Sequence, residues 1–218
     1  MDQRTHEWFC ARLGHFTGSE IGKLMISSKK KDELFGDGAI SYIIEKMAER
    51  DLIDEIKEDE EVFNEYHYIT STANKAMQFG TDNEPLARKL IIKELGEDFE
   101  EVGSIPHPSI KWFSSSPDGM SKDNSIALEI KCPSIDAVMR YRCFVKDGES
   151  LKKEKSLYYW QAMSHMAVTG AKACVFVVFN PFLKHPLYHF VVDRDEKAIQ
   201  ELETRVIKAN EYIESLKQ

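Results

Sequence analysis

The sequence lacks any run of about 18 consecutive apolar residues, so we expect no membrane span. Residues 1–7 lack the apolar segment of a secretory signal peptide. Cysteine is scarce, and no two cysteines are separated by only two or three residues, which argues against a zinc ribbon or an iron–sulfur cluster. The phosphate-binding loop of helicases and ATPases is also missing. We therefore expect a cytoplasmic protein with free thiols and no ATPase activity.

A basic excess is missing too. Lys and Arg number 29 against 37 Asp and Glu, a net charge of −8, whereas nucleic-acid binders are usually basic. The charge is uneven, however: residues 1–31 hold six basic and three acidic side chains, and residues 49–65 hold nine acidic ones. We interpret 49–65 as a charged helical or loop elaboration with a solvated outer face. The net negative charge therefore argues against a DNA-binding function but does not exclude it.

Hydrophobic residues make up 42% of the 218 residues, enough for the core of one domain spanning 1–218. Apolar spacing predicts an early helix ending at Ile26 with Thr17 or Ser19 as its cap, and a helix with Ile40, Ile43, Ile44 and Met47 on one side. Asn83 and Ser156 are expected to cap two further helices. The predicted helices after the first cover residues 39–50, 84–95, 134–144, 157–168 and 194–216.

Short β-branched and aromatic runs predict strands between these helices. The expected strands cover residues 102–105, 111–115, 125–131, 173–179 and 187–192. Asp118-Gly119 and Asp123-Asn124 are expected to form turns. The order of elements predicts an α/β fold with a mixed central sheet flanked by helices.

The pattern that carries chemistry is Ser116-Pro117-Asp118-Gly119 followed by Glu129-Ile130-Lys131. Strand alternation places Glu129 and Lys131 on one face, and it turns the Ile130 side chain to the opposite, buried face. Two carboxylates and a free backbone carbonyl at Ile130 suit Mg²⁺, and an ammonium can orient the attacking water. A strand with Glu-x-Lys is also a common surface pair, but the apolar neighbours of these residues favour a buried magnesium site.

Two further polar residues have a functional and a structural interpretation. Glu84 would add a carboxylate to the site, or it would simply stabilise the start of a helix through its dipole. Gln161 stands among aromatic residues, where it would support the site or be a hydrogen-bonded core residue. His165 lies one helical turn after Gln161 and would face the same cleft, although a packed or solvent-exposed side chain is the simpler expectation there.

Together these motifs resemble the lambda exonuclease group of phage-type recombination nucleases, the YqaJ-like viral recombinases of the PD-(D/E)xK nuclease superfamily. The resemblance extends from Arg4 to about Phe179. It rests on six ordered motifs, which are Arg4-x-x-x-Trp8, Arg12-Leu-Gly-x-Phe-Thr-Gly-Ser19-Glu-Ile, Gly80-x-x-x-Glu84, Ser116-Pro-Asp-Gly, Glu129-Ile-Lys-Cys-Pro and Tyr159-x-Gln161. The family implies a restriction-endonuclease-like core.

The resemblance also implies roles for individual residues. Asp118, Glu129 and the Ile130 carbonyl would bind two Mg²⁺ ions, for which Mn²⁺ would substitute. Lys131 would position water, and Glu84 and Gln161 would complete the catalytic site. Arg12 and Ser19 match positions that bind the 5′ phosphate of the recessed strand. Residues 29–31, three consecutive lysines that include Lys29, would line the DNA entrance unless they form a solvated basic loop.

The implied activity is 5′→3′ exonucleolysis of double-stranded DNA ends, which leaves 3′ single-stranded tails for recombination. The implied setting is a phage or prophage in a bacterial cytoplasm, with a ring-shaped homotrimer and a single-strand annealing protein as partners. Two alternatives remain open from the sequence. One is a structure-specific endonuclease or single-strand exonuclease of the same superfamily, and the other is a DNA-end-binding recombination scaffold without catalysis.

Overall fold

The computed structural model describes residues 2–30, 33–71 and 74–217, so Lys31 lies outside the described residues. Its centre is a five-stranded sheet in the order β2-β5-β6-β7-β8, in which β6 and β7 run parallel and the other neighbours antiparallel. The strands are β2 Phe99–Glu100, β5 Gly119–Ser121, β6 Ile126–Lys131, β7 Ala173–Phe179 and β8 Leu187–Asp193. The predicted α/β fold with a mixed sheet flanked by helices is confirmed.

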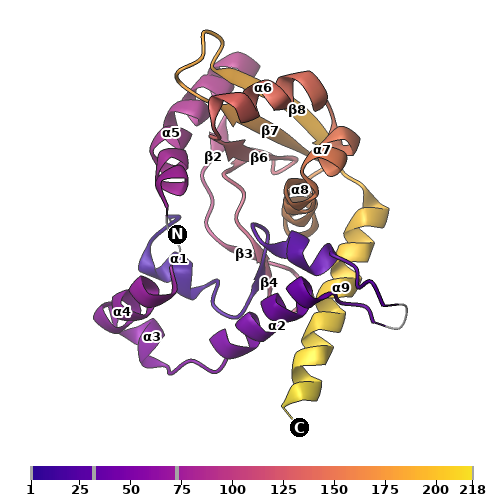
Figure 1. Ribbon diagram of the computed structural model, residues 1–218. Helices are drawn as coiled ribbons and strands as arrows, with labels where there is room; N and C mark the ends of the chain where they lie inside the picture. The colour runs from indigo at the N-terminus through magenta and orange to yellow at the C-terminus, as the bar shows by residue number, and fades with distance from the viewer. Residues whose placement is uncertain (1, 31–32, 72–73, 218) are drawn as a thin grey trace.

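Helices cover both faces of this sheet (Figure 1). The helical elements are α1 His6–Cys10, the 3₁₀ helix Ile21–Met25, α2 Asp37–Glu49, α3 Glu55–Glu58, α4 Glu60–Thr70, α5 Lys75–Leu95, α6 Ile135–Phe144, α7 Gly148–Glu154, α8 Ser156–Thr169 and α9 Glu196–Leu216. On one face, Ala87 and Ile91 of α5 pack against Leu128 and Ile130 of β6. On the other face, α8 and α9 pack against Ala127 and the even-numbered residues of β7. The opposite orientations of Ile130 and Glu129 therefore follow from strand alternation, as predicted.

A second, three-stranded sheet was not predicted. It has the order β1-β4-β3, with β1 Phe16–Thr17, β3 Ile105–Pro106 and β4 Phe113–Ser115. Thr17 therefore pairs with Ser114 in a strand and does not cap a helix, and the 3₁₀ helix that follows has no side-chain cap. Through the pairing of β1 with β4, this sheet places the N-terminal part of the chain beside the strand that leads to Asp118.

The largest error in the predicted elements concerns the helix that carries Glu84. Asn74 caps α5 by accepting hydrogen bonds from Ala76 N and Met77 N, both at 3.0 Å, so Glu84 lies in the middle of the helix. Asn83 is no cap; its side chain donates to Phe79 O. Pro85 removes one backbone hydrogen bond, and the packing of the remaining turns maintains the helix.

Three smaller predictions are also wrong. Gly119 begins strand β5, so Asp118-Gly119 is not a reversing turn. In α2, Ile44 is exposed whereas Tyr42 and Lys46 are buried. The face of the helix that packs on the core is therefore not the predicted one. Ser156 makes no side-chain cap for α8. The turn at Asp123-Asn124 is confirmed, with Asn124 at φ 59°.

The acidic stretch 49–65 covers the end of α2, α3 and the first half of α4. Ile56 and Phe63 are buried, and Phe63 lies 5.7 Å from the Phe9 ring of α1. Apart from Glu49, which pairs with Lys46 and accepts from Gly14 N, its carboxylates are exposed, and α3 and α4 pack on α1 (lower left in Figure 1). In the described part of the chain, none of the helices is long and apolar enough to cross a membrane.

Candidate active site

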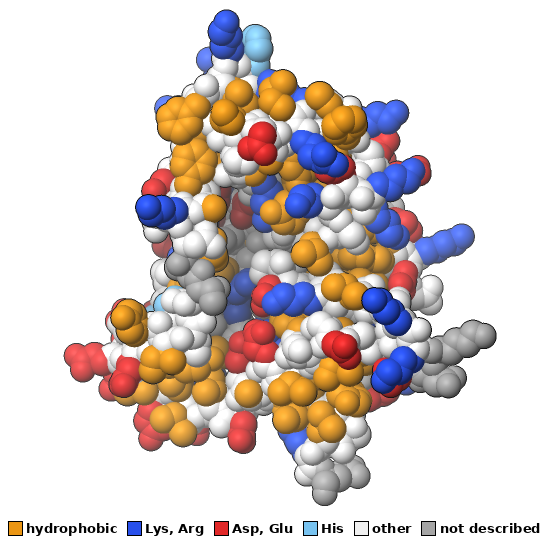
Figure 2. All heavy atoms as spheres, viewed as in Figure 1, with side chains coloured by type: hydrophobic (Ala, Val, Ile, Leu, Met, Phe, Trp, Pro, Cys, Tyr) orange, Lys and Arg blue, Asp and Glu red, His pale blue; other side chains and the backbone are white. Residues whose placement is uncertain are grey.

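A cleft of about 1040 Å³ opens between α5 and α8, beside the ends of β6 and β7. Figure 2 shows this hollow, with basic and acidic side chains at its walls. The lining includes the predicted residues Arg12, Ser19, Glu84, Asp118, Glu129, Ile130, Lys131 and Gln161. The fold therefore brings eight of the nine predicted site residues into one cavity.

Asp118 forms one part of the cleft floor, at the entry to β5. Its Oδ2 accepts a hydrogen bond of 2.6 Å from Ile130 N, and its own N–H donates to Leu128 O at 2.9 Å. These two bonds fix Asp118 against β6. Burial, followed by the neighbouring carboxylates of Glu129 and Glu84, raises the pKa of Asp118 well above its usual value.

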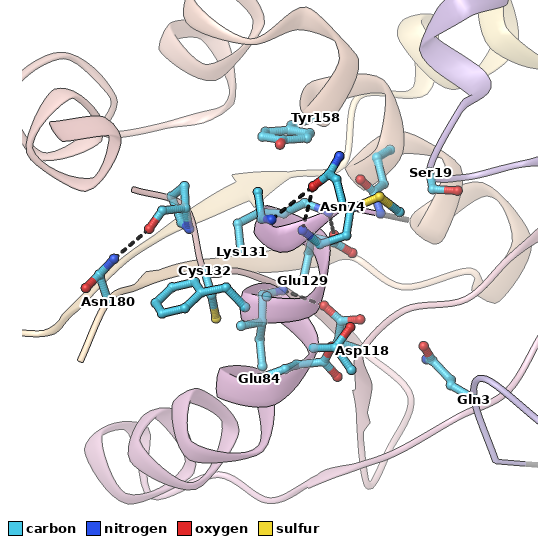
Figure 3. A pocket seen from close by; sticks show the side chains of 18 of the residues that line it. Gln3, Ser19, Asn74, Glu84, Asp118, Glu129, Lys131, Cys132, Tyr158 and Asn180 are labelled. Carbon is cyan, nitrogen blue, oxygen red and sulfur yellow. Dashed lines mark hydrogen bonds and ion pairs between the residues drawn. The ribbon is translucent and has the colours of Figure 1, made fainter. Parts of the chain in front are cut away.

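Glu129 and Lys131 lie side by side on β6, as their spacing predicts (Figure 3). Lys131 Nζ is 2.5 Å from Glu129 Oε1, and the Glu129 side chain is only 1% exposed. Burial alone would raise the pKa of Glu129, but the Lys131 ammonium and the hydrogen bond from His165 lower it. Burial alone would lower the pKa of Lys131, but Glu129 and Asp118 raise it. Glu129 is thus held as a carboxylate and Lys131 as an ammonium.

Glu84 reaches the same floor from the middle of α5 (Figure 3). Its two carboxylate oxygens form ion pairs with Arg4 and, at 3.1 Å, with Arg88. Arg4 has φ 67°, and Gln3 beside it donates hydrogen bonds to Val102 O and Pro117 O. The first residues of the chain are therefore tied to the site, a contact that no local sequence signal predicts.

His165 is packed, as one of the sequence-based expectations has it, but its contact with Glu129 was not predicted. It is 0% exposed and lies behind the floor, where its Nε2 is 2.6 Å from Glu129 Oε2. Its Nδ1 is 2.7 Å from Ser115 Oγ, which is 2.9 Å from Ser164 Oγ. The position one turn after Gln161 was the available signal. Gln161 itself is buried and lines the cleft from α8.

The hydroxyls of Ser115 and Ser164, beside His165, leave no room for a side chain at position 18, which is a glycine. A Cβ at Gly18 would lie 2.1 Å from Ser115 Oγ and 2.6 Å from Ser164 Oγ, closer than any real contact. The backbone that leads to Ser19 is therefore packed directly on the hydrogen-bonded residues behind Glu129.

Arg12 and Ser19 form a cationic wall on the other side of the cleft. Arg12 donates to Ser116 Oγ at 3.0 Å and to Ser19 Oγ at 3.2 Å, and its guanidinium lies 4.1 Å from the centre of the Trp8 ring. Burial lowers the pKa of Arg12 to about 10, so the guanidinium remains charged at neutral pH. In the structure its partners are neutral hydroxyls and a ring, which leaves its charge available to an anion.

Lys29 is not brought to this cleft. It is exposed and does not line the cavity, and its neighbour Lys30 forms an ion pair of 2.9 Å with Glu33. Lys29 and Lys30 therefore agree with the alternative expectation, that these lysines form a solvated basic loop.

The donor chemistry of the floor fits a hard divalent cation. Asp118, Glu129 and the Ile130 carbonyl supply oxygen ligands, and Mg²⁺ needs only one or two carboxylates beside water and phosphate oxygens. Burial first, and then the carboxylates of Glu129 and Glu84, raise the pKa of Asp118, and a cation bound beside Asp118 would offset that effect. Over residues 2–30, 33–71 and 74–217, no group of three or more Asp, Glu, His or Cys side chains is placed so that it could hold a metal ion. Water and substrate would therefore have to complete the coordination.

Comparison with known proteins gives consistent results. Residues 7–172 match the family model of the YqaJ-like viral recombinase domain. The alkaline exonuclease LHK-Exo from Laribacter hongkongensis is similar at 32% identity and TM-score 0.75, covering 98% of this chain and 96% of that one. The structure of LHK-Exo in complex with dAMP gives a TM-score of 0.76 at the same identity and coverage.

A phage-related exonuclease from Haemophilus somnus 129PT has TM-score 0.69 at 16% identity, covering 93% of this chain and 94% of that one. At that identity the likeness shows the fold alone. No curated protein matches the sequence.

Proposed function

This chain belongs to the YqaJ-like viral recombinase family, and we propose that it is a magnesium-dependent 5′→3′ exonuclease acting on double-stranded DNA ends. Its product would be a duplex with 3′ single-stranded tails, the substrate of phage-type recombination. The family and its exonuclease relatives support a DNA exonuclease; the metal, the polarity and the duplex substrate are our proposal.

One observation carries this proposal: a single cleft holds crowded carboxylates on its floor and a guanidinium without an acidic partner on its wall. The carboxylates of the floor would attract a cation, and the guanidinium of Arg12 on the wall would attract an anion. A metal ion on the floor and a terminal phosphate on the wall would satisfy both, and an exonuclease that starts from a phosphorylated end would hold both.

Asp118, Glu129 and the Ile130 carbonyl would hold the metal, which we expect to be two Mg²⁺ ions with Mn²⁺ as a substitute. When bound, the metal supplies an activated water and neutralises charge in the transition state. Lys131, 2.5 Å from Glu129, would orient the attacking water and stabilise negative charge on the phosphate. Glu84 would enlarge the negative floor, and Gln161 would support the site from α8.

Arg12 and Ser19 would bind the 5′ phosphate of the strand being cleaved. The guanidinium is already oriented by Ser116 and Trp8, so little side-chain entropy is lost on binding. LHK-Exo binds dAMP, a mononucleotide of the kind that stepwise cleavage releases. Arg12 would set the end of the strand one such step from the metal.

We extend the proposal to assembly and setting. A homotrimeric ring around DNA would place the acidic helices α3 and α4 outside, and a single-strand annealing protein would receive the 3′ tails. The setting would be a bacterial cytoplasm, with a phage or prophage as the source. The molar mass of the purified protein by light scattering tests the trimer.

Strand-resolved digestion tests the activity. Linear duplex DNA labelled at the 5′ end or at the 3′ end of one strand is incubated with Mg²⁺, and the 5′ label should be released at once whereas the 3′ label should be released late or not at all. Lys131→Ala should lower the rate by about 10²–10³-fold, the usual cost of one preorganised charge in an active site. Lys152→Ala is the matched control, since Lys152 stacks on Trp160 outside the cleft. Full activity in Lys131→Ala would contradict the mechanism, and cleavage of closed circular duplex would favour an endonuclease.

The terminal phosphate is tested separately with Arg12→Ala. Charge-assisted hydrogen bonds contribute about 1.5–3 kcal/mol, so the rate on 5′-phosphorylated ends should fall about 10- to 150-fold. The rate on 5′-hydroxyl ends should hardly change. Arg140→Ala serves as control, because Arg140 pairs with Glu154 away from the cleft. An equal loss on both kinds of end would show that Arg12 does not bind the phosphate.

A further inference from the structure

Phe182 is a large apolar side chain left open to solvent at the rim of the cleft. It follows β7 and is 80% exposed, although it lines the same cavity as the carboxylates. One neighbour is Phe79 of α5, whose ring centre lies 6.1 Å away at an interplanar angle of 23°. Single exposed apolar side chains are common at protein surfaces, and what distinguishes Phe182 is that its exposed ring lines the cleft that holds the carboxylates.

The turn that presents Phe182 is held rigidly. Buried Asn180 accepts a hydrogen bond of 3.1 Å from Phe182 N and donates one of 2.7 Å to Pro133 O. Asn180 N also donates to Pro186 O at 3.0 Å, which closes the base of the turn. Because Pro133 follows Lys131 by two residues, the turn is tied to the strand end that carries the proposed catalytic lysine.

Phe182 and the proposed phosphate site lie at opposite ends of the cleft. Figure 3 shows Asn180 on one side of Glu129 and Lys131 and Ser19 on the other. A strand with its terminal phosphate at Ser19 and its scissile bond above Glu129 would continue toward Asn180. The exposed Lys75 also lines the cleft, one helical turn before Phe79 on α5, and offers a positive charge to the strand's backbone.

We infer that Phe182 is a stacking platform for a nucleobase of the strand still to be cleaved, on the 3′ side of the scissile phosphate. This inference rests on the proposed function of the cleft. An exposed aromatic face beside a basic side chain is the arrangement with which proteins hold single-stranded DNA, since every base offers a π-face. Phe182 would hold the next nucleotides in line while Arg12 holds the terminal phosphate.

The test measures binding without cleavage, on the full chain in the presence of a chelator. The probe is a 5′-phosphorylated single-stranded oligonucleotide, and its affinity is followed by fluorescence anisotropy. Phe182→Ala should weaken binding about 5- to 150-fold, the effect of one base stacked on an aromatic ring, and Phe182→Trp should preserve it. Phe144→Ala is the control; Phe144 is 63% exposed on α6, does not line the cleft, and should leave binding unchanged.

A second measurement reports stacking directly. 2-Aminopurine is placed at successive positions from the 5′ end of the probe, and its fluorescence should be quenched most strongly at one internal position. Phe182→Ala should remove that quenching, and Phe182→Trp should retain it. Equal quenching in wild type and Phe182→Ala would overturn the stacking platform.

The outcomes separate this inference from the proposed function. If Arg12→Ala weakens binding and Phe182→Ala does not, the stacking platform fails while the proposed function stands. If the wild type does not bind the single-stranded probe, the stacking platform is overturned, and the strand-resolved digestion of duplex DNA decides the proposed function independently. If Phe182→Ala instead lowers the oligomeric mass in sedimentation and leaves the quenching intact, Phe182 contacts a second copy of the chain and the inference is wrong.

Discussion

The floor and the wall of the cleft carry buried charges of opposite sign, carboxylates on the floor and a guanidinium on the wall. On the floor, Asp118, Glu129 and Glu84 converge, and their mutual repulsion together with burial raises the pKa of Asp118. On the wall, Arg12 lies against the Trp8 ring and beside His15, and burial together with nearby cations lowers the pKa of His15 to about 4. On the floor, Glu129 pairs with Lys131 and Glu84 with Arg4 and Arg88, so among the described residues Asp118 is the floor carboxylate without an ion pair. On the wall, the side-chain hydrogen-bond partners of Arg12 are hydroxyls.

This difference shows how one small cleft can be prepared for two kinds of ligand. A divalent cation would relieve the repulsion on the floor, and a phosphate would neutralise the wall. The bonds within each region already fix its geometry, so ligand binding would need little rearrangement. Substitutions that change the charge of one region should therefore affect stability and activity in opposite directions.

The largest effect is expected from Asp118→Asn. Activity should fall at least about 10²–10³-fold, because a proposed metal ligand and its charge are lost. Stability without metal should increase, since Asn removes the repulsion with Glu129 and its carbonyl still accepts from Ile130 N. Each gain of 1 kcal/mol would raise Tm by roughly 2–4 °C in a chain of this size. Thermal unfolding of wild type and Asp118→Asn in the presence of a chelator measures this difference in Tm.

The sign of the pH dependence follows from the raised pKa of Asp118. A proton held more tightly in the folded state favours folding below the ordinary value of 3.8, and that contribution is lost as pH rises through the folded pKa. The stability advantage of Asp118→Asn in chelator should therefore grow with pH, and Mg²⁺ should reduce it. A variant less stable than wild type at neutral pH in chelator would refute the charge repulsion.

An intermediate effect is expected at His165, which acts on the floor through Glu129. His165→Asn places its amide near Ser115 but leaves Glu129 Oε2 without a donor, whereas the longer His165→Gln reaches Glu129. Loss of such a supporting bond commonly costs 10- to 100-fold in metal affinity or activity, so we expect about that loss for Asn and partial recovery for Gln.

Mn²⁺ binding without DNA, followed by electron paramagnetic resonance, distinguishes positioning from mere stability. The Asn variant should bind Mn²⁺ more weakly at a temperature where it is fully folded. Unchanged Mn²⁺ affinity with reduced Tm would assign His165 a purely structural role.

The smallest effect is expected at His15, which is near Arg12 but does not line the cleft. Desolvation first, then Arg50 and Arg12, lower its pKa from 6.5 to about 4. Its stabilising contribution is complete above pH 6.5 and is lost as pH falls toward 4, because the unfolded state binds the proton more readily. Allowing for its partial exposure, wild type should lose about 1–2 kcal/mol between pH 7 and 4.5 that His15→Leu does not lose. Urea unfolding at both values checks this; parallel losses would mean that His15 titrates normally.

Much of the fold follows from local pattern. The strand over 173–179 and the helices after Pro133 and after Arg194 form close to where apolar spacing places them, because burial of a periodic face decides both. Asn74 and Asn83 show the limit of such reasoning. Both are good caps by residue type, and packing of α5 on β6 decided in favour of Asn74.

By itself, the sequence determined that Glu129 and Lys131 share a face and that Asp118 precedes them at a distance suited to pairing, since both are consequences of backbone geometry over a few residues. Only the tertiary structure decided that Glu84 arrives from mid-helix, that His165 supports Glu129 and that Arg4 pairs with Glu84. Those partners lie 36 to 80 residues apart, and nothing local encodes a contact over that distance. The burial that gives the floor its shifted pKa values likewise comes from packing of the whole chain, which no short motif contains.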